Sequence, residues 1–390
     1  MRIYLDYNAT APAAPEVQDA VARAMREDFG NPSSVHAFGQ QAKAALDEAR
    51  GQVAALIGAD PAEIVFTSGG TESDNFAIRG AFETLAPAGS RRIVTTGIEH
   101  EAVLNTVKAL AARGADVVTV PAGRDGVVDI EALTAAITPE TALVSLMLAN
   151  NEVGTIQPVD VIAAQCRQHG ALLHTDAVQA VGKIPVSVRA LGVDLLAMSA
   201  HKFSGPKGVG AIWIRRGVRL ISQATGGRQE RNRRGGTENV PAIAGMGVAS
   251  RLAREALSGG HLDAMRVLRD RLEAGVLETI EGTVVNGAAD GRVPNTTNIS
   301  FDGIEAESLL IALDLEGVAV STGSACSSGT LEPSHVLKAM GLPQAFARNS
   351  LRFSLGPSTT AAEIAFVLDV LPRLVSKLRR LGRTAAALRP

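Results

Sequence analysis

A lysine and an aspartate each follow an apolar run that is typical of a strand. Lys202 comes shortly after residues 194–198, and Asp176 lies 26 residues upstream, after residues 171–174. Because open α/β sheets bind ligands at the carboxyl ends of their strands, we expect both side chains at one sheet edge. Pyridoxal phosphate chemistry needs an amine that holds the aldehyde as a Schiff base and a carboxylate that keeps the pyridine nitrogen protonated. The alternative is that Lys202, beside Gly and Pro, is an ordinary solvated loop residue.

The elements that would position this pair alternate along the chain from about residue 60 to residue 215. Strands are expected at residues 64–67, 92–96, 116–120, 142–148, 171–174, 195–198 and 211–214, with helices between them such as 101–113 and 160–169. Short apolar strands that alternate with helices favour an α/β fold with a mostly parallel, seven-stranded sheet covered on both faces.

The pattern changes after about residue 255. A long helical stretch at 262–279 is followed by strands near 298–301, 318–320 and 351–354, and by helices from 361 to 381. This predicts a large domain of residues 15–255 and a smaller α+β domain of residues 1–14 and 256–390, in which the first dozen residues pack with the C-terminal part.

Composition narrows the class of protein. The 390 residues carry 38 basic and 40 acidic side chains, a net charge of −2, which argues against nucleic acid or an anionic membrane as the main partner. No apolar span of 18 residues and no signal-peptide pattern are present, and two cysteines cannot build a disulfide framework. A reduced, cytoplasmic enzyme without a resident metal is expected.

A phosphate site is expected at residues 67–75, Thr-Ser-Gly-Gly-Thr-Glu-Ser-Asp-Asn. Its glycines, among them Gly70, would let the backbone approach a phosphate at a helix start near Thr71. Ser199 and His201, which flank Lys202, would add donors. The alternative is an ordinary turn between a strand and a helix.

Two further polar residues follow expected strands. Gln179 lies three residues past Asp176 and would reach the phenolic oxygen of the cofactor. His100 follows the strand at 92–96 and would stack on the pyridine ring and move protons near neutral pH. A lone histidine is otherwise more often structural.

Of the two cysteines, only one lies in a setting that suits reactivity. Cys326 belongs to Ser-Thr-Gly-Ser-Ala-Cys-Ser-Ser-Gly-Thr, residues 321–330, which is expected to form an exposed, mobile loop before a helix after Pro333. Cys166 lies on an expected helix and is interpreted as a buried structural residue.

Arg352 is a basic residue on an otherwise apolar strand, 351–354, and such a residue needs an anion. A two-pronged grip on a substrate carboxylate is one use of an arginine in this position. A salt bridge to a structural Asp or Glu is the alternative.

Together these residues resemble the cysteine desulfurases of the NifS/IscS type, which are class V aminotransferase-like, fold-type I pyridoxal phosphate enzymes. The likeness runs nearly end to end, through Tyr4-Leu-Asp-Tyr-Asn-Ala-Thr10, Phe29-Gly-Asn-Pro-Ser-Ser34, Phe66-Thr-Ser-Gly-Gly-Thr-Glu-Ser73, Asn150-Asn-Glu-Val-Gly154, His174-Thr-Asp-Ala-Val-Gln179, Ser199-Ala-His-Lys202, Arg234-Gly-Gly-Thr-Glu-Asn239, Ser324-Ala-Cys-Ser327 and Leu351-Arg-Phe-Ser354. Within the family, Asn-Asn-Glu-Val-Gly, Asp-Ala-Val-Gln-Ala-Val-Gly-Lys and Gly-Thr-Glu-Asn are closer to the nitrogen-fixation branch.

The resemblance implies a role for each matching residue. Lys202 would hold the cofactor and later move the Cα proton, Asp176 would pair with the ring nitrogen, and His100 would cover the ring. The remaining roles are phosphate binding by Gly70, Thr71, Ser199 and His201, phosphate binding across a homodimer interface by Thr237, contact with the cofactor oxygen by Gln179, and binding of the substrate carboxylate by Asn151 and Arg352, with Asn151 also among the cofactor contacts.

The implied reaction removes sulfur from L-cysteine. Alanine would be released and the sulfur left as a persulfide on Cys326, for transfer to an iron–sulfur scaffold protein and onward to nitrogenase. Cys326 would contact an iron–sulfur cluster only transiently. Arg228 departs from the histidine usual in the family. The alternatives are a selenocysteine lyase or another class V lyase or aminotransferase, and a non-catalytic sulfur carrier.

Overall fold

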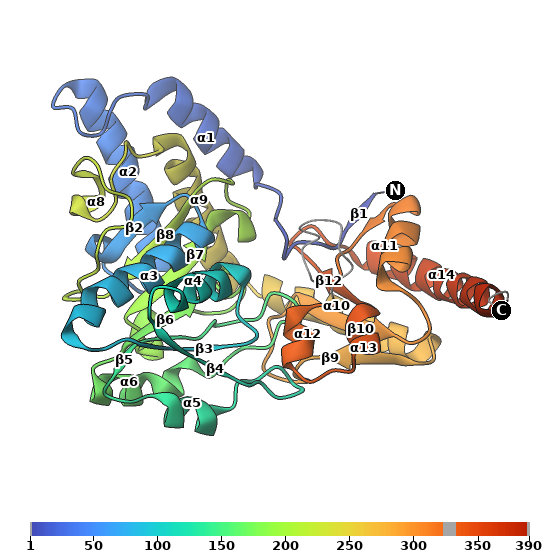
Figure 1. Cartoon of the computed structure of the whole chain (residues 1–390). Helices are drawn as coiled ribbons and strands as arrows, with labels where there is room; N and C mark the ends of the chain where they lie inside the picture. Colours follow the sequence, from blue (N-terminus) through green and yellow to red (C-terminus); the bar gives the residue numbers. More distant parts are fainter. Residues whose placement is uncertain (1, 323–332, 388–390) are drawn as a thin grey trace.

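The computed structural model describes residues 2–322 and 333–387, and its largest element is a seven-stranded sheet (Figure 1). In spatial order the strands are β2 (Ile64–Thr67), β8 (Gly210–Ile214), β7 (Leu195–Ser199), β6 (Leu172–Asp176), β5 (Thr141–Ser145), β3 (Arg92–Thr96) and β4 (Asp116–Val120). β8 pairs antiparallel with β2 and β7, whereas the other pairs are parallel. The predicted α/β fold with a mostly parallel sheet is confirmed.

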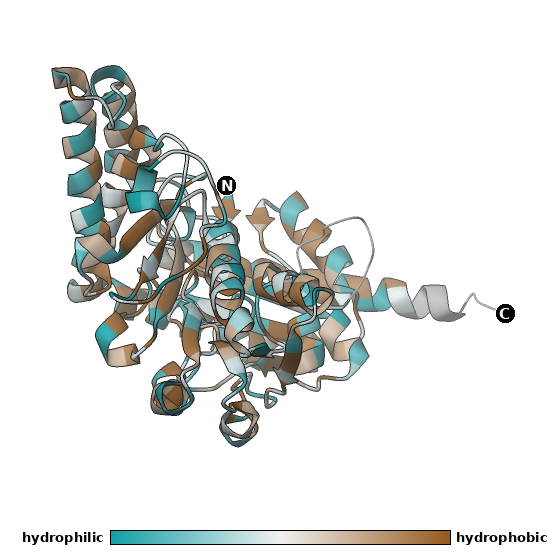
Figure 2. Cartoon of the chain, turned by 60° about the vertical axis from the view of Figure 1, so that its left-hand side comes forward, coloured by the Kyte–Doolittle hydropathy of each residue, from teal (hydrophilic) through white to brown (hydrophobic). Residues whose placement is uncertain are grey.

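Helices cover both faces of this sheet, which explains why β2, β5, β7 and β8 are buried along their whole length. In β8, Ala211 and Trp213 belong to one hydrophobic cluster, and Ile212 and Ile214 belong to another on the opposite face. The first cluster is covered by α2 (Ala37–Leu56), α6 (Ala163–His169) and α9 (Val240–Ser258), and the second by α3 (Gly70–Leu85) and α4 (Glu101–Ala111). In Figure 2 the strands inside the molecule are mainly hydrophobic, whereas the outer helices alternate hydrophilic and hydrophobic residues.

One expected strand is shorter than the sequence suggests. The assigned strand β5 ends at Ser145, and the backbone N–H of Met147 donates instead to the buried Glu99 side chain at 2.7 Å. The N–H groups of Leu146 and Leu148 still donate to the backbone oxygens of His174 and Asp176 on β6, at 3.1 and 2.8 Å, so residues 146–148 stay buried beside that strand. The expected helix at 160–169 likewise opens as a 3-10 turn, Val159–Ile162, before α6.

A second group of elements surrounds its own hydrophobic cluster. It contains the antiparallel sheet β12 (Ser350–Ser354), β10 (Thr296–Phe301) and β9 (Thr283–Asn286), with α10 (His261–Thr279), α11 (Ala306–Leu315) and α14 (Ala361–Ala387). The N-terminal segment joins it, because β1 (Ile3–Tyr4) pairs with β11 (Val318–Ala319). β9 was not expected from the sequence, and the predicted boundary at residue 255 falls inside α9.

Within the described residues, no helix is both long and apolar enough to span a membrane. The same part of the chain contains no group of three or more His, Cys, Asp and Glu side chains that could hold a metal ion.

Candidate active site

A pocket of about 390 Å³ lies at the carboxyl ends of β6 and β7 and is closed on one side by residues of β12 and the N-terminal segment. Most residues that the sequence predicts for the site line it: Gly70, Thr71, His100, Asn151, Asp176, Gln179, Ser199, His201, Lys202 and Arg352. Asn8, Ala9, Asp74, Met147, Val178 and Ser321 complete its described wall. The tertiary structure therefore gathers side chains from five strand ends and the N-terminus around one cavity.

The start of α3 forms an anion site in this wall. The helix begins at Gly70, its N-cap is Gly69, and no side chain caps its first turn. The free N–H groups and the positive end of the helix dipole favour a phosphate there. A Cβ at position 70 would lie 2.7 Å from Cγ2 of Val178, so only glycine allows this backbone approach. The turn between β2 and α3 lies where the sequence predicts it, and the donors of the first helical turn suit a phosphate.

Asp176 is the last residue of β6 and is 5% exposed. Its Oδ1 accepts the N–H of Val178 at 2.9 Å. Burial, together with the nearby Asp74, raises the pKa of Asp176 to about 6. A cationic ring nitrogen bound in the pocket would therefore stabilise the charged carboxylate and be stabilised by it.

His100 has a structural role besides lining the pocket. It is the N-cap residue of α4, and its Nδ1 accepts the N–H of Ala102 at 3.1 Å. This bond places the proton of the neutral imidazole on Nε2. The structural and functional interpretations of His100 are thus compatible, since one ring nitrogen caps the helix and leaves the other for a ligand.

Lys202 ends the short 3-10 turn Ala200–Lys202 that follows β7. Its ammonium group donates to the backbone oxygens of Asn8 at 2.7 Å and Ala9 at 2.9 Å. Burial, with the like charge of Arg352, lowers the pKa of Lys202 to about 8. The residue is therefore not a solvated loop lysine, and its amine is readily deprotonated.

A pH dependence follows from this lowered pKa. Only the neutral amine attacks an aldehyde, so capture of pyridoxal phosphate by the cofactor-free protein is expected to slow about tenfold per pH unit below pH 8. The rate should level off above that pH, whereas an amine with the ordinary pKa would keep accelerating towards pH 10. Growth of the visible absorbance after mixing at a series of pH values measures this rate. A rate that still rises steeply between pH 9 and pH 10 would contradict the lowered pKa.

Arg352 forms the salt bridge to a carboxylate that was the alternative to its predicted role in binding a substrate. Its Nη2 forms a salt bridge to Asp6 at 2.7 Å, and its Nη1 donates to the backbone oxygen of Asn151 at 2.9 Å. Among the described residues, the buried Nε of Arg352 and Oδ1 of Asn151 have no hydrogen-bond partner. Because a buried polar atom without a partner is costly, this pair suits a polar ligand in the adjacent pocket.

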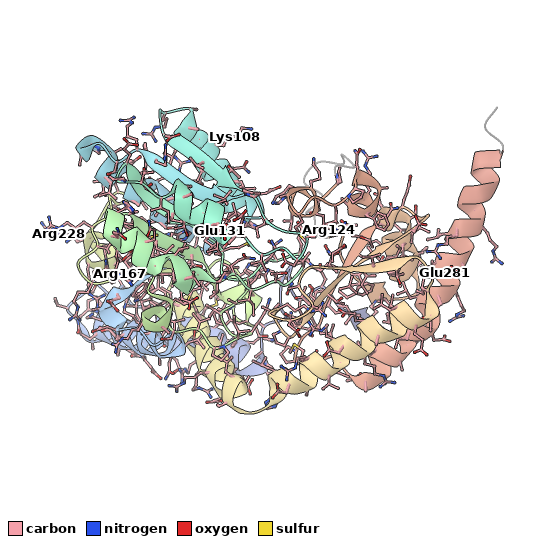
Figure 3. The ribbon with its side chains drawn as sticks, turned by 90° about the horizontal axis from the view of Figure 1, so that it is seen from below. Lys108, Arg124, Glu131, Arg167, Arg228 and Glu281 are labelled. Atoms are coloured by element: carbon pink, nitrogen blue, oxygen red, sulfur yellow. The ribbon has the colours of Figure 1, made fainter. Side chains whose placement is uncertain are left out.

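Not every residue named from the sequence lines this pocket. Thr237 is exposed and is not part of the pocket of its own chain. The segment before it is tied down by the salt bridges Arg234–Glu72 at 2.9 Å and Arg50–Glu230 at 2.6 Å. Arg228 is exposed at the edge of the molecule (Figure 3). Cys326 lies outside the described residues. Cys166 is buried on α6, and burial raises the pKa of its thiol to about 12.

Two polar residues of the site were assigned no role from the sequence. Asn8 accepts a hydrogen bond from Lys202 through its backbone oxygen and lines the pocket. Asp74, on α3, is fully buried, and burial raises the pKa of its carboxyl to about 8. Both lie within motifs quoted above, but nothing in their distance along the chain from Lys202 indicates that they share its pocket.

Comparison with known proteins places the whole chain among relatives of one kind. Residues 3–367 match the family model described as aminotransferase class-V. A cysteine desulfurase of Trichormus azollae is 49% identical over 380 residues, which is 97% of this chain and 94% of the relative. A cysteine desulfurase IscS of Dictyoglomus turgidum is 48% identical, covering 97% and 96%. A solved NifS-like protein superposes with a TM-score of 0.91 at 40% identity, over 97% of this chain and all of the other.

Proposed function

Because this chain belongs to the aminotransferase class-V family and to its cysteine desulfurases, we propose that it uses pyridoxal phosphate to convert L-cysteine to L-alanine and keeps the sulfur as a persulfide on Cys326. The observation that carries the proposal is one pocket that contains Lys202, Asp176 and the uncapped start of α3. These are an amine of lowered pKa, a buried carboxylate and an anion site.

The residues that line the pocket match the chemical groups of pyridoxal phosphate. Gly70, Thr71, Ser199 and His201 would bind its phosphate, and Asp176 would pair with its ring nitrogen. His100 would cover the ring and Gln179 would face its phenolic oxygen. When bound, pyridoxal phosphate supplies an aldehyde that condenses with amines and a protonated ring that takes up the electrons released at Cα.

The residues of the chain bind the substrate and move its protons. Arg352 and Asn151 would hold the carboxylate of L-cysteine, for which the buried Arg352 Nε has an unused donor. Asp6 balances the charge of Arg352 before the substrate arrives. Lys202, once its amine is free and neutral, would remove the Cα proton and return a proton later.

Sulfur transfer is a balanced exchange between two thiols. The Cys326 thiolate would form a bond to the sulfur of the substrate while the Cβ–S bond breaks. The electron pair of the broken bond stays with carbon, which gains a proton and becomes the methyl group of alanine. Two thiols thus become a methyl group and a persulfide, and no external oxidant is required.

The cellular setting extends this proposal. An iron–sulfur scaffold protein would accept the sulfur, as the IscS name of a relative suggests, and nitrogenase maturation would be the downstream use. Thr237, exposed here, would complete the phosphate site of a second copy in a homodimer. A cytoplasmic location suits a thiol that must stay reduced.

The products of a single turnover test the proposal directly. The purified protein mixed with L-cysteine, without a reductant, should yield one alanine for each persulfide formed on the protein. A thiol reductant should then allow repeated turnover with sulfide release. Pyruvate and ammonia in place of alanine, or alanine without any protein-bound sulfur, would contradict a desulfurase.

A further inference from the structure

Lys183 is a buried lysine behind the pocket to which the mechanism above assigns no role. It is 7% exposed and does not line the cavity. Its ammonium group donates to Oδ1 of Asn8 at 2.8 Å and makes a short hydrogen bond to Oε1 of Gln179. Its partners are thus two neutral side-chain amides and, among the described residues, no carboxylate lies within ion-pair distance of it. Lysines are rarely buried without an ionic partner, so this one needs an explanation.

The contact determines how the Gln179 amide is turned. An ammonium group only donates hydrogen bonds, so Lys183 must face the carbonyl oxygen of Gln179 and not its nitrogen. The nitrogen, Nε2, uses one N–H to donate to the backbone oxygen of Asn8 at 2.9 Å. Because Gln179 lines the pocket, its second N–H is the group left for a ligand.

Asn8 is held in the same way. Its Oδ1 also accepts a hydrogen bond from Asn295 at 3.0 Å, and its Nδ2 donates to Thr296 at 2.8 Å and to the backbone oxygen of Asn151 at 3.1 Å. Both polar atoms of the Asn8 side chain thus have partners, and these partners fix which way the Asn8 amide is turned. Lys183 therefore contacts a rigid frame, and the orientation of Gln179 follows from that frame.

The charges around Lys183 also suit an anion in the pocket. Burial, followed by the like charges of Lys202 and Arg352, lowers the pKa of Lys183. Two carboxylates act on the charge of Lys202, namely Asp176 and Asp6, and Asp6 is already paired with Arg352. An anionic oxygen bound beside Gln179 would favour the charged form of Lys183.

We propose that Lys183 is a positioning residue that locks the Gln179 amide with its N–H towards the pocket, so that Gln179 donates to the anionic phenolic oxygen of the bound cofactor. This inference rests on the proposed function, since it requires pyridoxal phosphate in the pocket. Lys183 itself touches neither cofactor nor substrate. It would act on the phenolic oxygen of the cofactor indirectly, by orienting the Gln179 amide and by its positive charge.

The proposal predicts a spectroscopic shift. In the cofactor-loaded protein, the phenolic oxygen would be close to the nitrogen that joins the cofactor to Lys202, and the two atoms would share one proton. A hydrogen-bond donor and a positive charge near this oxygen would lower the proton affinity of the pair. In Lys183→Met both are lost, because Gln179 is free to flip. The apparent pKa of the visible absorbance change is therefore expected to rise by about one unit.

The experiment compares pH titrations of the visible absorbance in five cofactor-loaded proteins, the wild type and four variants. Lys183→Met should be shifted upward, Lys183→Arg should resemble the wild type, and Lys108→Met, which removes an exposed charge from α4, should not shift. Gln179→Leu should shift in the same direction as Lys183→Met. If Lys183→Met does not fold, Lys183→Gln removes the charge while it keeps a donor and an acceptor.

The outcomes separate this inference from the proposed function. A wild-type protein that binds no pyridoxal phosphate would overturn the proposed function itself. A wild type that binds and titrates, together with an unshifted Lys183→Met or an equal shift in Lys108→Met, would overturn the role of Lys183 alone.

Discussion

Lys202→Ala is expected to lower alanine formation from L-cysteine by about 10²–10⁴-fold, the range that a positioned acid–base group contributes. The variant lacks the amine that holds the cofactor and the base that moves the Cα proton. The anion site at the start of α3 and the Asp176 carboxylate remain, so the cofactor should still bind, but without a covalent link. Alanine formation and the visible spectrum of the bound cofactor measure the two effects separately.

Lys207→Ala is the matched control for this variant. Lys207 lies in the same run of sequence, but it is exposed and does not line the pocket. It should retain alanine formation close to that of the wild type. If Lys202→Ala kept more than a tenth of the wild-type rate, proton transfer at Cα would depend on another group, and His100 would be the first to test.

Cys326→Ala has the second large expected effect. Persulfide formation requires a thiolate that attacks the sulfur of the substrate, and the variant has none. Alanine formation is expected to fall by at least about 10²-fold, since a covalent nucleophile splits a difficult step into easier ones. The cofactor absorbance should be retained, because Cys326 is not among the residues proposed to hold the cofactor.

The second cysteine of the chain provides the control for this experiment. Cys166 is buried on α6, and burial raises the pKa of its thiol to about 12, so it is not a nucleophile. Cys166→Ala should therefore form alanine and persulfide like the wild type. Equal alanine from Cys326→Ala and the wild type would mean that sulfur leaves without Cys326. Selenide release that survives the substitution would then favour the selenocysteine lyase alternative.

Much of the fold could be predicted because its signals are local. The strands at β2, β3 and β4 coincide with apolar runs of the same bounds, and the position of Asp176 at a strand end follows from one β/α/β unit. β9 was not predicted, since its four residues are partly exposed and carry no apolar alternation. The expected strand at 142–148 extends three residues past the end of β5, because Leu146 and Leu148 remain buried and still donate to the backbone of β6.

The sequence by itself determined where the strands of the large sheet lie, which residues could react, and that Lys202 and Asp176 follow strands. Each of these features is encoded by a short stretch of neighbouring residues. Only the tertiary structure decided what surrounds these groups. Asn8 meets Lys202 and Lys183 across separations of 194 and 175 residues, and no periodicity reaches so far. The lowered pKa of Lys202 likewise arises from burial by segments distant in sequence, which local pattern does not encode.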